Sequence, residues 1–203
     1  DLLLAVGVRF DDRAVGKAAE FCAKAKIIHI DIDASEFGKI KKPWISLASD
    51  AKIALERILP LVKENRREKW MAELRRLKLN HPKPGDLPSR RLMGLIDSSA
   101  GPNRIVTTDV GQHQMWAAQH LPLNHPGTFL TSGGLGTMGF GLPAALGAAL
   151  ASPESRVICI TGDGSILMNI QELATLAELG MDVSILVLNN KHLGLVRQQQ
   201  ELF

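Results

Sequence analysis

Apolar runs with the character of buried strands open the chain. The runs Leu2 to Val6 and Lys26 to Asp33 are rich in leucine, valine and isoleucine, a composition typical of parallel strands. Between them, the residues from about Arg13 to Ala23 favour a helix. The order strand, helix, strand predicts a right-handed βαβ unit. His29 lies inside the second run, where we expect a buried histidine with its hydrogen bonds satisfied.

This pattern continues to a break rich in proline and glycine. A short strand is expected at Ile45 to Ala48 and a helix at about Lys52 to Val62. The charged run from Lys63 to Leu79 is typical of a solvent-exposed helix. Proline and glycine then interrupt every periodicity. The predicted organisation is two domains and a linker, at residues 1–80, 89–203 and 81–88.

The second domain shows the same alternation of helix and strand. Ser89 suits the N-cap of a helix that runs to about Ser99, and Arg104 to Val110 is the next expected strand. The glycine-rich stretch from Ser132 to Gly141 leads into a helix of small residues, Leu142 to Ala151, which permits close packing. The predicted fold class is α/β, built from parallel-sheet βαβ units.

One strand–helix–strand unit of this domain carries candidate ligands at both strand ends. The apolar strand Val157 to Ile160 runs into Gly162-Asp163-Gly164, and a second strand, Val183 to Leu188, ends in Asn189-Asn190. A helix is expected between them from about Asn169, with Asn169 and Glu172 forming a capping box.

Parallel strands bring their carboxyl ends to one edge of a sheet, where ligands of open α/β sheets bind. Asp163 and Asn190 are therefore expected to meet, and their carboxylate and carbonyl oxygens suit Mg²⁺. The glycines beside Asp163 would leave room for a diphosphate. Either motif alone usually marks a turn. Both together in one βαβ unit form the signature of thiamine-diphosphate enzymes.

Composition and charge exclude several other classes of protein. The formal net charge is +3, but Lys and Arg concentrate in the charged run and aromatic residues are only 4% of the chain, which argues against nucleic-acid binding. No apolar run approaches the roughly 20 residues of a membrane helix. Cys22 and Cys159 have neither disulfide nor zinc spacing. We expect a cytoplasmic protein without nucleic-acid or membrane partners.

Three further stretches resemble the catalytic subunits of the acetolactate synthase family. These stretches are Gly7 to Arg13, Asp109 to Trp116 and Thr131 to Leu142. The resemblance extends over the whole chain. It implies that residues 1–80 are the later part of a central FAD-binding domain and that residues 89–203 are most of a thiamine-diphosphate-binding domain, truncated at its carboxyl end.

The resemblance implies a cofactor site in the second domain. Mg²⁺ would be held by Asp163, Asn190 and the backbone carbonyl of His192. Met138 would support the bent form of the cofactor, a role that suits an apolar and adaptable thioether, although simple core packing is the alternative. The residues implied as thiamine-diphosphate contacts are Val110, Gly111, Gln112, His113, Gly136, Met138, Gly164, Ser165, Leu193, Gly194 and Leu195.

An FAD site is also implied. Asp31 ends a strand where nucleotide-binding folds place a carboxylate on a ribose, but no Gly-x-Gly-x-x-Gly is present, and Ser49 replaces a common glycine of the family. The residues implied as FAD contacts are Gly7, Arg9, Asp12, Arg13, Asp31, Ile32, Asp50, Gln114, Met115, Gly133 and Gly134.

The implied reaction is the condensation of two pyruvate molecules, or of pyruvate with 2-ketobutyrate, with loss of CO₂, in branched-chain amino-acid biosynthesis. The implied assembly is a homodimer or homotetramer with a small regulatory subunit. We expect the 203-residue chain alone to be inactive, because the family's pyrimidine-activating glutamate belongs to an amino-terminal domain. Another thiamine-diphosphate decarboxylase, oxidase or carboligase, such as glyoxylate carboligase, and a non-catalytic cofactor-binding module remain as alternatives.

One position departs from the family in a way that bears on substrate choice. Gln199 stands where most members have a tryptophan that packs against the extra methyl group of 2-ketobutyrate, and Leu195 stands where they have methionine. An amide offers little apolar surface. We expect Gln199 to weaken the preference for 2-ketobutyrate, although Gln199 as an ordinary solvated helix residue is the alternative.

Overall fold

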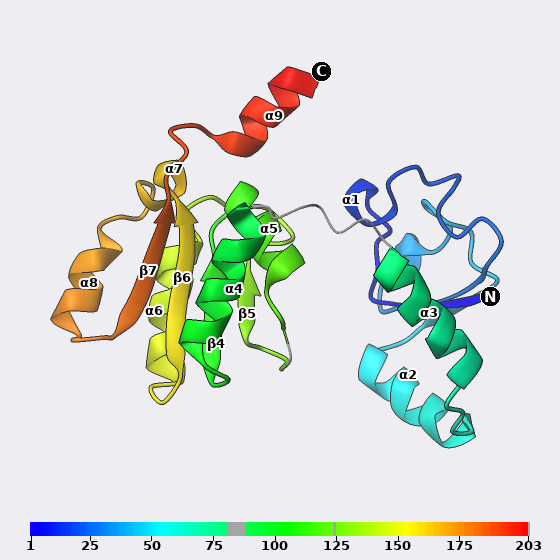
Figure 1. Cartoon of the computed structure of the whole chain (residues 1–203). Coiled ribbons are helices and arrows are strands. Elements are labelled where there is room, and N and C mark those ends of the chain that lie inside the picture. Colours follow the sequence, from blue (N-terminus) through cyan, green and yellow to red (C-terminus); the bar gives the residue numbers. More distant parts are fainter. Residues whose placement is uncertain (81–87, 124, 203) are drawn as a thin grey trace. The chain divides into compact units, whose positions relative to one another are not determined.

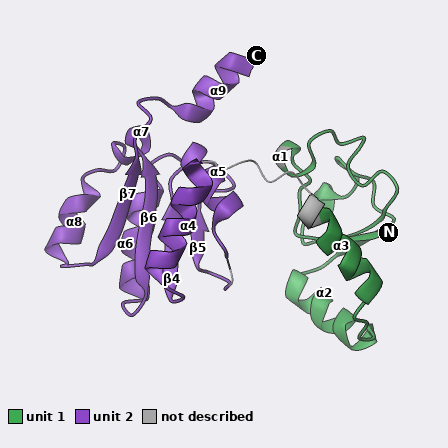
Figure 2. Ribbon diagram, in the orientation of Figure 1, with its two compact units in different colours: residues 1–81 green, residues 82–203 purple. Residues whose placement is uncertain are grey.

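Two compact units make up the chain, Asp1–His81 and Pro82–Phe203 (Figure 2). The computed structural model describes residues 1–80, 88–123 and 125–202. Apart from Pro88, the predicted linker at 81–88 therefore lies outside the described residues. Each unit contains its own parallel β-sheet with helices, which confirms the predicted α/β class.

The sheet of the first unit has three parallel strands in the order β1-β2-β3. They are β1 (Leu2–Val6), β2 (Lys26–Asp31) and β3 (Ile45–Ala48). In register, Leu2 lies opposite Lys26, and Ile28 opposite Ile45. Because all three strands run the same way, the residues that follow them gather at one edge of this sheet.

The first predicted helix is much shorter than its sequence suggests. α1 spans Asp12–Val15, starting behind Asp11, whose Oδ1 accepts a hydrogen bond from the Ala14 amide at 2.9 Å. Gly16 ends it with φ of +55°, a left-handed conformation that suits glycine. Turns follow as far as β2, so the expected helix from Arg13 to Ala23 is wrong beyond Val15.

His29 is buried in β2 but not satisfied. Its ring lies edge-on to Phe10 and Phe37, with centroid distances of 5.1 and 5.0 Å. Neither ring nitrogen has a hydrogen-bond partner among the described residues, which contradicts the expectation of a satisfied core histidine. The aromatic neighbours explain the burial, since they offer ring faces and edges rather than acceptors.

The remaining helices of this unit follow β2 and β3. They are the 3₁₀ helix η1 (Ala34–Glu36), α2 (Ala51–Ile58), the 3₁₀ helix η2 (Leu59–Leu61) and α3 (Glu68–Asn80). The charged run forms α3 only from Glu68 onward, and nearly all of its described side chains are exposed, as expected.

The sheet of the second unit has four parallel strands in the order β5-β4-β6-β7. They are β5 (Phe129–Thr131), β4 (Arg104–Thr108), β6 (Arg156–Gly162) and β7 (Val183–Leu188). Figure 1 shows helices on both faces of this sheet. One face carries α4 (Pro88–Ala100) and α5 (Gln112–His120), and the other carries α6 (Gly141–Ala151) and α8 (Glu172–Glu178). Among the described residues, none of the helices of either unit is long and apolar enough to cross a membrane.

Strand β6 is the centre of two apolar cores. Ile158 and Ile160 point to the core shared with α4 and α5, whereas Val157 and Cys159 point to the core shared with α6 and α8. This alternation follows from the two-residue period of a strand. The small side chains of α6 let it pack closely, and Ala145 is fully buried there.

Several boundaries in this unit differ from the prediction. Helix α4 begins at Pro88, so Ser89 is its second residue rather than its N-cap, because proline suits the first helical position. Helix α8 begins at Glu172, and its N-cap, Gln171, makes no side-chain capping bond, so the predicted capping box at Asn169 is wrong. Two short elements at the strand ends were not predicted, α5 and α7 (Asp163–Ile166).

Candidate functional site

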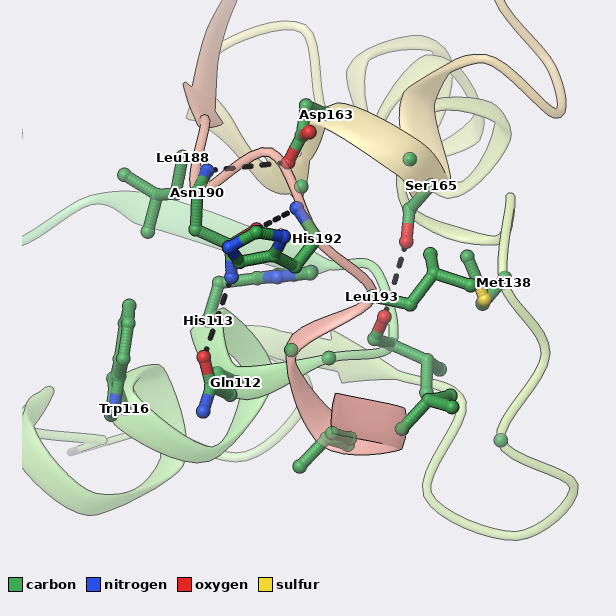
Figure 3. A pocket seen from close by; sticks show the side chains of 18 residues that line it. Gln112, His113, Trp116, Met138, Asp163, Ser165, Leu188, Asn190, His192 and Leu193 are labelled. Carbon is green, nitrogen blue, oxygen red and sulfur yellow. Dashed lines mark hydrogen bonds between the residues drawn. The ribbon is translucent and has the colours of Figure 1, made fainter. Parts of the chain in front are cut away.

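A cavity of about 160 Å³ lies where β4, β6 and β7 end (Figure 3). Helix α7 starts directly after β6, α5 follows β4, and the loop after β7 leads into α9 (Gly194–Leu202). β6 pairs with β4 on one side and with β7 on the other, which brings these three strand ends together. The site thus lies at the carboxyl edge of a parallel sheet, the usual ligand position in open α/β folds.

Every residue predicted for the metal and for thiamine diphosphate lines this cavity. These residues are Val110, Gly111, Gln112, His113, Gly136, Met138, Asp163, Gly164, Ser165, Asn190, His192, Leu193, Gly194 and Leu195. Four other lining residues were missed: Trp116, Gly162, Leu188 and Val196. Trp116 lies one helical turn beyond Gln112, so recognising α5 would have been the signal to find it.

Asp163 and Asn190 are in contact across the two strand ends, as the spacing predicts. The Asn190 amide N–H donates to Asp163 Oδ1 at 3.4 Å, drawn as a dashed line in Figure 3. Asn190 Oδ1 accepts from the His192 N–H at 3.0 Å, and Asn190 Nδ2 donates to Gln112 Oε1 at 3.4 Å. These bonds hold the loop after β7 against α5 and α7.

The oxygen atoms of this pair fit Mg²⁺. Within the described part of the chain, no three His, Cys, Asp or Glu side chains are grouped to hold a metal ion, so the protein does not form a complete cage there. Mg²⁺ commonly takes only one or two protein side chains and fills its octahedron with phosphate oxygens and water. An aspartate with a neighbouring asparagine at the mouth of a cavity matches that preference.

His113 presents an unpaired nitrogen at the same site. The ring is buried, with only 5% exposed, and its Nε2 has no hydrogen-bond partner among the described residues. Burial lowers the pKa of His113, an effect partly opposed by the charge of Asp109, by a backbone hydrogen bond to Asp109 and by the charge of Asp163. Nε2 can donate to a phosphate oxygen in the cavity only when it carries a proton.

The glycines beside Asp163 make room for protein side chains. A Cβ at Gly162 would lie 3.0 Å from His113 Cε1, and one at Gly164 would lie 2.8 Å from Leu193 Cδ2. A Cβ at either position would therefore crowd a side chain that lines the cavity. Room for a diphosphate beside these glycines stays a prediction.

Asp109 is a buried carboxylate that sequence reasoning did not single out as a site residue. It follows β4, and only 1% of it is exposed. Its Oδ1 accepts from the amides of Gly139 at 2.7 Å and Val110 at 2.9 Å, while Oδ2 accepts from Gly141 at 3.3 Å and from the Thr161 hydroxyl at 3.4 Å. Asp109 thereby ties the glycine-rich loop to the strand ends.

Gln199 stands apart from the other predicted site residues. It is exposed on α9 and is not among the residues that line the cavity, whereas Leu195 and Val196 of the same helix are.

The predicted FAD residues of the first unit lie at or near the carboxyl edge of its sheet. Gly7, after β1, donates to Ile30 O at 2.9 Å, and Ser49, after β3, donates to Asp31 O at 3.0 Å. Asp50 caps α2, since its Oδ1 accepts from the Ile53 amide at 3.0 Å. Of the remaining predicted residues, Arg9 precedes α1, Asp12 and Arg13 lie within it, and Ile32 follows β2 with 78% exposure.

The other predicted FAD residues belong to the second unit. Gln114 and Met115 are in α5, and Gly133 and Gly134 follow β5. The Gln114 side chain donates to the Thr131 hydroxyl at 2.8 Å, which places α5 beside the end of β5. These four residues do not line the cavity at the end of β6.

Comparison with known proteins finds similar sequences for both units. The family described as "Thiamine pyrophosphate enzyme, central domain" matches residues 1–58, and "Thiamine pyrophosphate enzyme, C-terminal TPP binding domain" matches residues 109–203. The chain is 52% identical to the acetolactate synthase isozyme 1 large subunit of Escherichia coli, 48% to acetolactate synthase 1, chloroplastic, of Nicotiana tabacum, and 46% to the acetolactate synthase large subunit of Parasynechococcus marenigrum. All of this chain is covered in each comparison, but it spans only 37%, 32% and 34% of these relatives.

Proposed function

Because this chain belongs to the thiamine pyrophosphate enzymes and is homologous to acetolactate synthase large subunits, we propose that the full-length protein carrying it is an acetolactate synthase. It would convert two pyruvate molecules, or pyruvate and 2-ketobutyrate, into 2-acetolactate or 2-aceto-2-hydroxybutyrate with release of CO₂, as the first common step of branched-chain amino-acid biosynthesis. The observation that carries the proposal is that every residue predicted for the metal and for thiamine diphosphate lines one cavity.

In this proposal the metal and diphosphate lie at the strand ends. Asp163, Asn190 and the backbone carbonyl of His192 would hold Mg²⁺. The His113 ring, with Nε2 protonated, would donate to the diphosphate, which Gln112, Gly164 and Ser165 would also face. Support comes from the unpaired Nε2 of His113 and from the Ser165 hydroxyl, which donates to Val110 O at 3.1 Å and so fixes α7 to the end of β4.

The apolar part of the cavity would receive the rest of the cofactor. Met138 and Gly136 come from the glycine-rich loop, and Leu193 and Leu195 from the opposite side. When bound, thiamine diphosphate supplies an electron sink for decarboxylation of a 2-keto acid. The chain's own contribution would be placement of the cofactor, support of its bent form by Met138, and exclusion of water by these apolar walls.

We also propose that the protein binds FAD, which this family does not use for net redox chemistry. The support is the convergence of Gly7, Asp31 and Asp50 at one edge of a three-stranded parallel sheet, with the exposed apolar side chain of Ile32 beside them. Gln114, Met115, Gly133 and Gly134 of the second unit would complete the contacts.

The assembly and location are further proposals. Relatives from Escherichia coli and Parasynechococcus marenigrum are named large subunits. We therefore propose a homodimer or homotetramer that associates with a small regulatory subunit. We propose a cytoplasmic location, for which the two free cysteines, Cys22 and Cys159, are suited.

The test is an assay of the full-length protein with pyruvate, Mg²⁺ and thiamine diphosphate. We expect acetolactate to form, and to form only when both cofactors are present. The Asp163→Asn variant is the control. Release of CO₂ without acetolactate would contradict the proposal and would indicate a decarboxylase. A product formed from glyoxylate but not from pyruvate would indicate a different carboligase.

A further inference from the structure

Asn169 makes a long-range bond instead of the helix cap that its sequence suggests. Its Nδ2 donates to the carbonyl oxygen of Gly139 at 2.7 Å, across 30 residues of chain. The side chain is half-buried between α7 and α8 and accepts a further bond from Gln171 Nε2 at 3.2 Å. A polar side chain of this kind is not needed to start α8, which begins at Glu172.

Gly139 is held on its other side by Asp109. The Gly139 N–H donates to the buried carboxylate of Asp109 at 2.7 Å, the shortest of the bonds that this side chain accepts. Residue 139 must be glycine here. Its φ is +91°, and a Cβ would lie 2.8 Å from Asn169 Nδ2 and 3.0 Å from Met168 Cβ. We call Asp109, Gly139 and Asn169 the loop clamp.

The loop clamp fixes the backbone directly beside Met138, the residue that precedes Gly139. The Gly139 N–H belongs to the peptide plane that joins Met138 to Gly139, and the Gly139 carbonyl belongs to the next plane. Two successive planes are therefore fixed by side chains from two other segments, the end of β4 and the segment after α7. Met138 itself has its side chain in the cavity, as Figure 3 shows.

We propose that Asn169, together with Asp109, is a positioning residue that sets the place of Met138 in the cofactor site. This inference rests on the proposed thiamine-diphosphate function of the cavity. Asn169 does not line the cavity, so it acts through Gly139. The side-chain bonds of Asn169 go to Gly139 and Gln171 and not to Asp163 or Asn190, so we expect the metal and diphosphate end of the site to change less when Asn169 is substituted.

Two substitutions of Asn169 in the full-length protein distinguish loss of its hydrogen bond to Gly139 from loss of side-chain packing. Asn169→Ala removes the side-chain amide. Asn169→Asp keeps its shape but replaces the donor with an oxygen that repels the Gly139 carbonyl. Asn103→Ala is the matched control, because Asn103 Nδ2 likewise donates to a loop carbonyl, that of Glu154 at 3.1 Å, beside the amino end of β6.

Amide hydrogen exchange of the cofactor-free protein is the first measurement. Peptides covering Thr137 to Gly141 should exchange faster in both Asn169 variants than in the wild type and in Asn103→Ala. With cofactor, we expect kcat to fall roughly tenfold to a hundredfold, while the dissociation constant of thiamine diphosphate changes by less than about threefold. The near-ultraviolet circular-dichroism signal of the bound 4′-imino tautomer should weaken in parallel.

These measurements distinguish failure of the proposed role of Asn169 from failure of the proposed thiamine-diphosphate function. If the wild type binds no thiamine diphosphate, the proposed function fails, whatever the exchange data show. If the wild type binds cofactor and is active, the positioning role of the loop clamp is refuted when Asn169→Asp matches the wild type in amide exchange and in kcat. It is also overturned if both Asn169 variants lose cofactor affinity and kcat together, because that result indicates general damage to the site.

Discussion

Asp163 and Asn190 meet at the mouth of the cavity with side chains that no apolar core requires. We predict that Asp163→Asn and Asn190→Ala each weaken Mg²⁺-dependent binding of thiamine diphosphate at least about tenfold, with little change in unfolding free energy, because Asn190 is exposed and Asp163 only half-buried. Equilibrium dialysis at fixed Mg²⁺ is the measurement. Asn189→Ala is the matched control, since Asn189 is adjacent but does not line the cavity. Undiminished binding in both variants would refute the metal site.

The buried thiol of Cys159 is expected to be unreactive in the folded protein. Burial raises the pKa of its thiol from an ordinary 9.0 to about 11, with a further contribution from Asp109 and an opposing one from Thr107. At pH 8 roughly a thousandth of this thiol is ionised. We predict that native Cys159 resists alkylation and reacts only on unfolding. Because the folded pKa is raised, the thiol's contribution to stability is present below pH 9 and is lost as pH rises toward 11. Rapid alkylation of Cys159 in the native protein would contradict the predicted resistance.

Gln199 stays a hypothesis about substrate choice. It is exposed on α9, one helical turn from Leu195, which does line the cavity. One methyl group in an apolar pocket is worth about 1 to 3 kcal/mol. We predict that the full-length enzyme prefers 2-ketobutyrate only weakly, and that Gln199→Trp strengthens this preference. Competition between the two keto acids is the measurement. A strong preference in the wild type, unchanged by the substitution, would refute the role.

Among the elements, α6 offers a paired test of close packing. A Cβ at Gly141 would lie 2.8 Å from the backbone nitrogen of Asp109, whereas one at Gly147, in the same helix, meets nothing within 4 Å. We predict that Gly141→Ala destabilises the fold by about 1 to 3 kcal/mol. Gly147→Ala should stabilise it by about 0.5 to 1 kcal/mol, because alanine favours a helix. Urea unfolding of both variants is the measurement, and equal effects would contradict the close contact at Gly141.

The same elements show how far sequence reasoning reaches. The predicted strands were placed well, because runs such as Val183 to Leu188 have one buried interpretation, but the three-residue strand β5 was missed. The meeting of Asp163 with Asn190 followed from strand direction alone. Helix ends were placed poorly. Gly16 ended α1 early, and Asn169 bonded to Gly139 rather than to its own helix. α5 was missed because its sequence, Gln112 to His120, has no clear apolar face. These outcomes depend on contacts between distant segments, which no local pattern contains.

At the scale of the whole molecule, the two units carry different parts of the proposed chemistry. The second unit contains the proposed metal and diphosphate site, and the first contains the sheet edge where we propose that FAD binds. Within the described residues that line the cavity, Asp163 is the one carboxylate, and we propose it as a metal ligand. No second acid in that lining is placed to activate a pyrimidine ring.

With Asp163 as the one carboxylate in the described lining, the cavity lacks a second acid of its own. We expect the 203-residue chain by itself to form no acetolactate from pyruvate, because a proton donor for the cofactor ring has to come from a residue outside this cavity lining. The same chain should still bind Mg²⁺ and thiamine diphosphate weakly, since those contacts are its own. The measurement is acetolactate formation by the purified chain beside its Asp163→Asn variant at matched concentration. Activity that is present in the first and absent in the second would show that the cavity needs no further acid, and would overturn the prediction.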